Sequence, residues 1–148
     1  MATGGGAGLS PLAPGTAGSA VGVGLFLALA GLGLPLYAAT IAGLTALGVW
    51  AADVAERVYG RKDDGRIVID EVAGQLLTLL PLLPAGRTGS PGWLVTGFVA
   101  FRVLDVWKPG PVRWMQDHLR GGAGVVMDDV LAGALGALAM AAALAALG

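Results

Sequence analysis

Long apolar runs alternate with short hydrophilic segments along this chain. Residues 17–34 form an apolar run of 18 residues, long enough to span a hydrocarbon core of about 30 Å at roughly 1.5 Å per residue. After Pro35 a second run covers residues 36–52, and residues 130–147 form the last run. One helix through both early runs would be about 54 Å long. We therefore expect a tight hairpin at residues 31–35.

Two shorter helices are predicted between these runs. The first of them begins near Ile67 and ends between Pro81 and Pro84, and the second covers residues 93–106. The apolar pattern therefore predicts an all-α, polytopic membrane bundle of about five apolar helices. The length of 148 residues leaves room for a single domain.

Two hydrophilic segments interrupt the pattern. Residues 53–66 contain Gly60 and Gly65, which we expect to stop a helix and turn the chain. Residues 107–124 are too rich in Pro and Gly for one straight helix. Within them, residues 112–119 are predicted to form a short helix that lies at the membrane interface.

Composition and charge support a membrane protein and predict its orientation. Hydrophobic residues make up 55% of the chain and charged residues 13%, whereas ordinary soluble domains carry about 25% charged residues. Five passes would put eight basic residues on the side of the two hydrophilic segments and Arg87 alone on the other. The positive-inside rule then predicts that the hydrophilic segments face the cytoplasm.

The residue types that are missing exclude several kinds of site. The chain has no cysteine, which excludes disulfides, thiolate metal sites and cysteine nucleophiles. Its single histidine, His118, cannot build a multi-histidine metal site, and a lone interfacial histidine is more often incidental. There is no G-x-x-x-x-G-K-S/T motif for a nucleotide, and we expect no nucleic-acid partner. The oligomeric state stays open.

Carboxylates gather at three predicted helix ends on the cytoplasmic side. They precede or open the third helix, close the fourth and open the fifth, and they are Asp63, Asp64, Asp70, Glu71, Asp105, Asp128 and Asp129. Clustered oxygen ligands suit Mg²⁺, which typically uses one or two carboxylates together with a substrate phosphate. The alternative is a solvated cytoplasmic face with interfacial ion pairs.

Two of these carboxylate positions are each followed by a glycine four residues later. Asp70 precedes Gly74, and Asp129 precedes Gly133. Residues four apart share one face of a helix. Each glycine therefore leaves room, one turn deeper, for a neighbouring helix or a ligand.

Basic and hydroxyl residues lie beside the acidic positions. Arg102 and Asp105 are three residues apart on one helix face and are predicted to pair. Cationic side chains and helix amino termini hold phosphate oxygens. The candidates for that role are Thr16, Ser19, Arg102, Lys108 and Arg113. The two hydroxyl residues could instead cap the first helix.

Four segments together resemble one enzyme family. They are S-P-L-A-P-G-T-A-G-S, K-D-D-G-R-I-V-I-D-E-V-A-G, F-R-V-L-D-V-W-K-P-G-P-V-R-W and G-G-A-G-V-V-M-D-D-V-L-A-G. In this order they strongly resemble the phosphatidylglycerophosphatase A family, from about Gly8 to Gly133. The resemblance implies a mostly helical, Mg²⁺-dependent lipid phosphatase of the bacterial inner membrane. Such enzymes hydrolyse the phosphate monoester of phosphatidylglycerophosphate to phosphatidylglycerol and inorganic phosphate.

The resemblance and the acidic pattern lead to one site hypothesis. Its metal ligands are Asp70, Glu71, Asp105, Asp128 and Asp129, with Asp63 as a further ligand or a loop-positioning residue. Lys108 and Arg102, with Arg113, would neutralise charge on the phosphate oxygens. Gln116 stands where the family's Asp is expected, with Asp117 beside it, and His118 and Asp64 occupy positions where the family is expected to vary. These departures weaken any role for Asp117, His118 or Asp64.

Two other classes compete with the phosphatase. A membrane ion-binding or transport subunit would place the same carboxylates along a cation path, but it predicts charges deep in several helices, and residues 130–147 have none. A CDP-alcohol phosphotransferase would carry D-x-x-D-G-x-x-A-R. Here Asp63, Asp64 and Gly65 are followed directly by Arg66.

Overall fold

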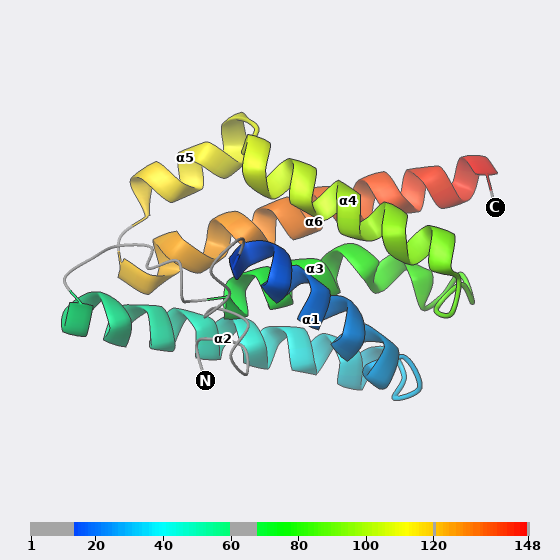
Figure 1. Ribbon diagram of the computed structural model, residues 1–148, viewed down its shortest axis with the longest axis horizontal. Helices are drawn as coiled ribbons and strands as arrows, with labels where there is room; N and C mark the ends of the chain where they lie inside the picture. The colour runs from blue at the N-terminus through cyan, green and yellow to red at the C-terminus, as the bar shows by residue number, and fades with distance from the viewer. Residues whose placement is uncertain (1–13, 60–67, 120, 148) are drawn as a thin grey trace.

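The computed structural model describes residues 14–59, 68–119 and 121–147, and every regular element in these ranges is helical (Figure 1). In chain order the elements are α1 (Pro14–Leu29), α2 (Leu34–Tyr59), α3 (Ile69–Leu79), the 3-10 helix η2 (Leu80–Leu82), α4 (Pro91–Trp107), α5 (Gly110–His118) and α6 (Gly121–Leu147). The prediction of an all-α fold is confirmed.

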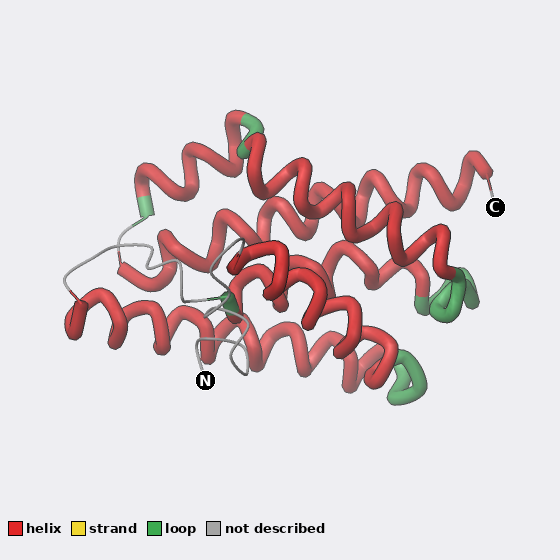
Figure 2. The backbone as a smooth tube through the Cα atoms, in the orientation of Figure 1, coloured by secondary structure: helices red, strands yellow, loops and turns green. Residues whose placement is uncertain are grey.

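The helices form one elongated bundle around α3. α3 contacts α1, α2, α4 and α6, and nine of its eleven residues are buried. α1, α2, α3, α4 and α6 run alternately back and forth along the long axis, and α5 continues in the direction of α4 (Figure 2). The starts of α1, α3 and α6 and the ends of α2 and α4 therefore lie in the half of the molecule that holds α5 (Figure 1). We call this half the α5 end.

One helix boundary differs from the prediction. α2 ends at Tyr59, next to Gly60, which was expected to stop a helix, whereas α6 begins at Gly121 instead of near Val130. The expectation that Asp128 and Asp129 open the last helix is therefore wrong, since both lie two turns inside α6. The physical reason is tertiary, because the glycines that locally favour a loop pack against α2. A Cβ atom on Gly122 would lie 2.1 Å from the carbonyl oxygen of Val49.

The predicted hairpin between the first two helices is present. α1 ends at Leu29 and α2 begins at Leu34. Gly33 in the connection has a φ of 80°, a left-handed conformation that glycine adopts without a steric penalty. Pro35 lies in the first turn of α2, where its missing N–H costs no intrahelical bond.

The core away from the α5 end is aromatic and aliphatic. Phe26 of α1 meets Tyr37 of α2 edge to face, with ring centroids 5.9 Å apart. The Tyr37 hydroxyl donates a hydrogen bond of 2.6 Å to the carbonyl oxygen of Leu76 in α3. Leu79 and Met140 complete the same cluster. These contacts hold α1, α2, α3 and α6 together below the carboxylates.

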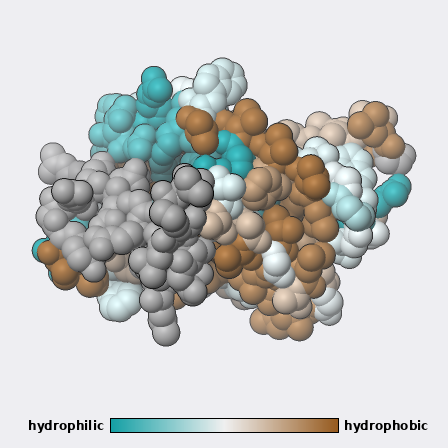
Figure 3. Space-filling model, in the orientation of Figure 1, coloured by the Kyte–Doolittle hydropathy of each residue, from teal (hydrophilic) through white to brown (hydrophobic). Residues whose placement is uncertain are grey.

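Two helices are long and apolar enough to cross a membrane. They are Leu34–Val58 and Gly121–Leu147, and only 22% of the most apolar window of each is buried. Core helices of soluble proteins are mostly buried, so this exposure favours a lipid-facing surface. Figure 3 shows a broad hydrophobic surface next to a hydrophilic area at the α5 end. α1 is a shorter apolar helix, and passage of all five helices through the bilayer stays a prediction.

Candidate active site

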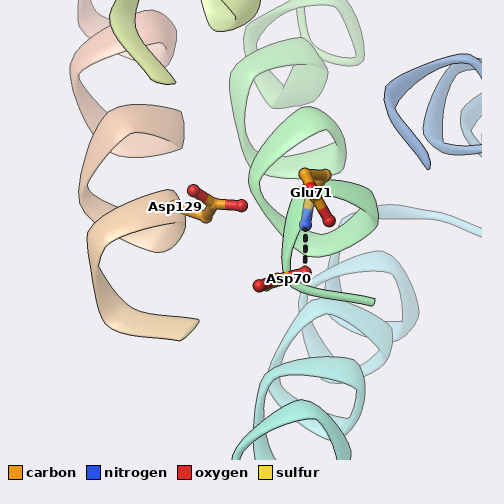
Figure 4. A group of neighbouring side chains, drawn as sticks. All are labelled: Asp70, Glu71 and Asp129. Carbon is orange, nitrogen blue, oxygen red and sulfur yellow. Dashed lines mark hydrogen bonds between the residues drawn. The ribbon is translucent and has the colours of Figure 1, made fainter. Parts of the chain in front are cut away.

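The acidic cluster is built where α3 crosses α6. A Cβ atom on Gly133 would lie 2.5 Å from the carbonyl oxygen of Gly74, so the two glycines let the helix backbones meet. Asp70 and Asp129 lie one turn before these glycines and are therefore brought together. One ligand oxygen from each of Asp70, Glu71 and Asp129 lies within 4.8 Å of the others. Figure 4 shows the Asp129 carboxylate pointing from α6 toward α3.

Burial of this acidic cluster leaves an acceptor without a donor. Asp70 is 4% exposed and Asp129 is 5% exposed. An Asp70 carboxylate oxygen accepts a hydrogen bond of 3.1 Å from the Glu71 backbone N–H. Among the described residues, Oε2 of Glu71 is buried and has no hydrogen-bond partner. Burying a carboxylate oxygen without a partner costs folding free energy, unless a cation or a hydrogen-bond donor compensates it.

Two cationic side chains flank the acidic cluster. Arg102 pairs with Asp105 within the last two turns of α4, as predicted from their spacing. Lys108 Nζ lies 2.6 Å from a carboxylate oxygen of Asp128 in α6. Lys108 ends α4 with a φ of 46°, and this left-handed turn separates α4 from α5.

The environment of Lys108 keeps its ammonium group charged. Burial alone would lower the Lys108 pKa, but the hydrogen bond and charge of Asp128 outweigh it, with smaller contributions from Asp129 and Asp105. The pKa of Lys108 is therefore raised above its ordinary value. The side chain stays a cation at neutral pH and faces three acidic residues of the site.

The start of α1 covers the remaining side of the acidic cluster. A Cβ atom on Gly15 would lie 2.9 Å from Oε1 of Glu71 and 3.0 Å from Nη1 of Arg102. A side chain at position 15 would therefore require the ends of Glu71 and Arg102 to shift, and glycine lets the first turn of α1 lie directly over this pair. Thr16 is exposed beside it. Ser19 is buried one turn later, and its hydroxyl donates a hydrogen bond of 2.9 Å to the Gly15 carbonyl oxygen.

The charge balance of the described residues fits a divalent cation. Five carboxylates at this site, with two cations between them, leave an excess of three negative charges if all are ionised; they are Asp70, Glu71, Asp105, Asp128 and Asp129, flanked by Arg102 and Lys108. Carboxylate oxygens are the ligands of hard cations such as Mg²⁺. The unpartnered Glu71 oxygen gives the same indication. The residues therefore fit a metal ion.

Other candidates lie at the edge of the site or outside the described residues. Asp63 and Asp64 fall in the range that the structure does not describe. Arg113 is exposed on α5. Asp117 is exposed as well, and the ring of His118 stacks on Trp114 with centroids 4.8 Å apart.

Asp53 is a residue of this site's scaffold that the sequence did not reveal. Its place in the hydrophilic segment of residues 53–66 gives no sign of a structural role, but its carboxylate accepts a hydrogen bond from the backbone N–H of Gly122. This N–H belongs to the first turn of α6 and has no partner within its own helix. The side chain thus caps α6 from α2. No local pattern in the sequence could have predicted this contact, because Asp53 and Gly122 are 69 residues apart.

Comparison with known proteins places this arrangement among lipid phosphatases. A family model described as "Phosphatidylglycerophosphatase A" matches residues 1–144. The Escherichia coli protein named phosphatidylglycerophosphatase A is 37% identical over 137 residues, which cover 93% of this chain and 77% of that protein. The Haemophilus influenzae protein of the same name is 36% identical, over 89% of this chain and 79% of the relative.

A third relative carries a different substrate in its name. A Bacteroides thetaiotaomicron protein, described as a proposed phosphatidylinositol-3-phosphatase, is 41% identical over 90% of this chain and 84% of its own length. No solved structure matches the chain.

Proposed function

Because the chain belongs to the phosphatidylglycerophosphatase A family, we propose that it hydrolyses the phosphate monoester of phosphatidylglycerophosphate. The products are phosphatidylglycerol and inorganic phosphate. The observation that carries the proposal is the cluster of Asp70, Glu71 and Asp129, in which both aspartates are buried and which two cations flank. A cluster of this kind meets the needs of phosphoryl transfer, in which positioning and charge neutralisation do most of the work.

Asp70, Glu71 and Asp129 would hold Mg²⁺, and we propose Asp105 and Asp128, the carboxylate partners of Arg102 and Lys108, as further ligands. A bound Mg²⁺ supplies Lewis-acid polarisation of the phosphate and lowers the pKa of a water molecule. The substrate brings its own phosphate oxygens, which Mg²⁺ commonly uses beside one or two protein carboxylates.

The cations of the chain would bind and neutralise the phosphate. Arg102 lies beside Glu71 under the first turn of α1, and Lys108 lies on the Asp128 side. Each can donate to a phosphate oxygen while it retains its carboxylate partner. Charge that builds on the oxygens during the reaction then meets two positive groups fixed by ion pairs.

The reaction forms one phosphorus–oxygen bond and breaks another. The water oxygen attacks phosphorus, one of its protons passes to a carboxylate of the acidic cluster, and the cluster returns a proton to the glycerol oxygen as the bond between that oxygen and phosphorus breaks. Thr16, exposed in the first turn of α1, would contact the phosphate from the other side, with Arg113 of α5 at the entrance. Ser19 would hold Gly15 in position, because its hydroxyl donates a hydrogen bond to the Gly15 carbonyl oxygen.

The proposed location is the bacterial inner membrane, with the α5 end facing the cytoplasm. The basic residues predicted on one side of the membrane include Arg57, Arg102, Lys108 and Arg113, and all four lie at the α5 end in α2, α4 or α5 or at their ends. Exposed valine and leucine side chains on the other helices would contact lipid. The lipid substrate then reaches the site without leaving the bilayer.

Phosphate release by the purified protein tests this function. In lipid vesicles, we expect release from phosphatidylglycerophosphate that requires Mg²⁺ and stops with a chelator. Phosphatidylinositol 3-phosphate, the substrate class in one relative's name, serves as the competing substrate. Faster release from that lipid would reassign the substrate, and ion flux without phosphate release would favour the ion-binding or transport alternative.

A further inference from the structure

The outward face of α4 carries an apolar groove that leads to the acidic site. The groove is a shallow, open hollow of about 520 Å³, and it is lined by Phe98, Val99, Arg102, Val103, Val106 and Trp107. Its lining is almost entirely apolar. We call it the α4 groove. A volume of this size lies within the range of small-molecule sites.

Arg102 joins the α4 groove to the acidic cluster. Its aliphatic stem lines the groove, while its guanidinium pairs with Asp105 and lies next to Gly15 and Glu71. A long cationic side chain commonly lies with its stem on an apolar surface and its charge in a polar site. A ligand that contacts both the aliphatic stem and the guanidinium group of Arg102 therefore needs an apolar chain joined to an anionic group.

We propose that the α4 groove binds an acyl chain of a glycerophospholipid whose phosphate lies at Arg102. The inference rests on the proposed function, because it assigns the place of the lipid part of the same substrate. The exposed valines along the groove would contact the chain, and Trp107, which is 70% exposed, would mark the level of the lipid headgroups. Tryptophan is enriched at that level of a bilayer.

A second copy of this chain fits the α4 groove less well than a lipid. Helices pack in membranes through small residues that allow close backbone approach. The groove presents Phe98, Trp107 and three valines, with no small residue among its lining. An acyl chain is flexible enough to follow such a surface, and its anionic headgroup complements Arg102.

Substitutions that fill the groove test the proposal. Val103→Phe adds bulk in the groove without adding polarity, and Val95→Phe is the matched control. Val95 is also exposed on α4 but lies outside the groove. Phosphate release is measured with the long-chain diacyl substrate and with the same headgroup without acyl chains. We expect Val103→Phe to lower kcat/KM about tenfold for the diacyl substrate only. We expect Val95→Phe to leave kcat/KM unchanged for both substrates.

The outcomes separate this proposal from the proposed function. Wild-type protein that releases phosphate from neither substrate contradicts the function itself. If the wild type is active and Val103→Phe lowers kcat/KM equally for both substrates, or for neither, the groove assignment is overturned while the proposed function stands.

A second measurement uses the wild-type protein, so it does not depend on how the variants fold. A phospholipid with a photoreactive acyl chain should label peptides that contain residues 98–107. Labelling confined to α2 or α6, or photocrosslinks from α4 to a second copy of the chain, would overturn the assignment.

Discussion

Gly74 of α3 and Gly133 of α6 meet back to back, so closely that a Cβ atom on Gly133 would lie 2.5 Å from the Gly74 carbonyl oxygen. One turn earlier on the same faces stand Asp70 and Asp129. Thr78 reinforces the crossing, because its hydroxyl lies 3.1 Å from the Gly74 carbonyl oxygen and 3.2 Å from that of Gly133. The distance between the two helices therefore sets the distance between the two carboxylates.

Gly133→Ala should separate these helices. The added methyl group meets backbone atoms, which cannot move aside as a flexible side chain can. We expect a loss of about 1–3 kcal/mol in unfolding free energy and a loss of phosphatase activity in the protein that remains folded. Gly43→Ala in α2 is the control, since its Cβ atom would meet nothing within 4 Å. Thermal unfolding and phosphate release on the same samples make the comparison, and equal behaviour of the two variants would contradict the crossing.

Metal binding should appear as a thermal shift. If Mg²⁺ binds only the folded protein, a concentration one hundred times the Kd adds about 2.7 kcal/mol of stability. Asp129→Asn removes one negative charge from a buried group of three. We expect this variant to unfold at a higher temperature than wild type in a chelator, because the buried repulsion falls, and to gain little from Mg²⁺. A Mg²⁺ shift as large as that of wild type would remove Asp129 from the ligand set.

Asp53→Ala should loosen the start of α6. The substitution leaves the Gly122 N–H without its acceptor, and loss of such a cap costs about 1 kcal/mol. Asp53→Asn keeps a side-chain oxygen and is the matched variant. Hydrogen exchange of the first turns of α6 reports the effect. Similar exchange in Asp53→Ala and wild type would show that the cap does not hold this helix end.

Lys108→Met should remove the ammonium group that pairs with the buried Asp128 carboxylate. Asp128 is 2% exposed, and the loss of one partner of such a pair costs about 3 kcal/mol. The double variant Lys108→Met/Asp128→Asn removes both charges and should recover most of that stability while activity stays low. Chemical denaturation of wild type, Lys108→Met, Asp128→Asn and the double variant gives the coupling energy. A coupling energy near zero would contradict an energetically important pair.

Local spacing was enough to predict several parts of the site. Residues three or four apart on a helix must share a face, so the Arg102–Asp105 pair followed directly from the sequence and is confirmed. The same rule placed Asp70 above Gly74. Of the two uses considered for the glycines, the structure shows that they admit a neighbouring helix.

Features that depend on contacts between distant segments could not be predicted. The run G-G-A-G before Val125 locally favours a loop, yet it is the first turn of α6 because Gly122 packs on α2 and Asp53 caps it. The Lys108–Asp128 pair joins the turn between α4 and α5 to α6, across 20 residues of the sequence. Neither relationship leaves a periodic signal in the sequence.

Phosphate release from phosphatidylglycerophosphate by Asp129→Asn and Asp70→Asn is the most direct test of the carboxylate cluster. Asp117→Asn is the control, because Asp117 is an exposed acid on α5. With saturating Mg²⁺ and folding checked by thermal unfolding, we expect each cluster variant to lose at least about a hundredfold in kcat/KM, and the control to match wild type. Near wild-type rates in Asp129→Asn or Asp70→Asn would contradict the account.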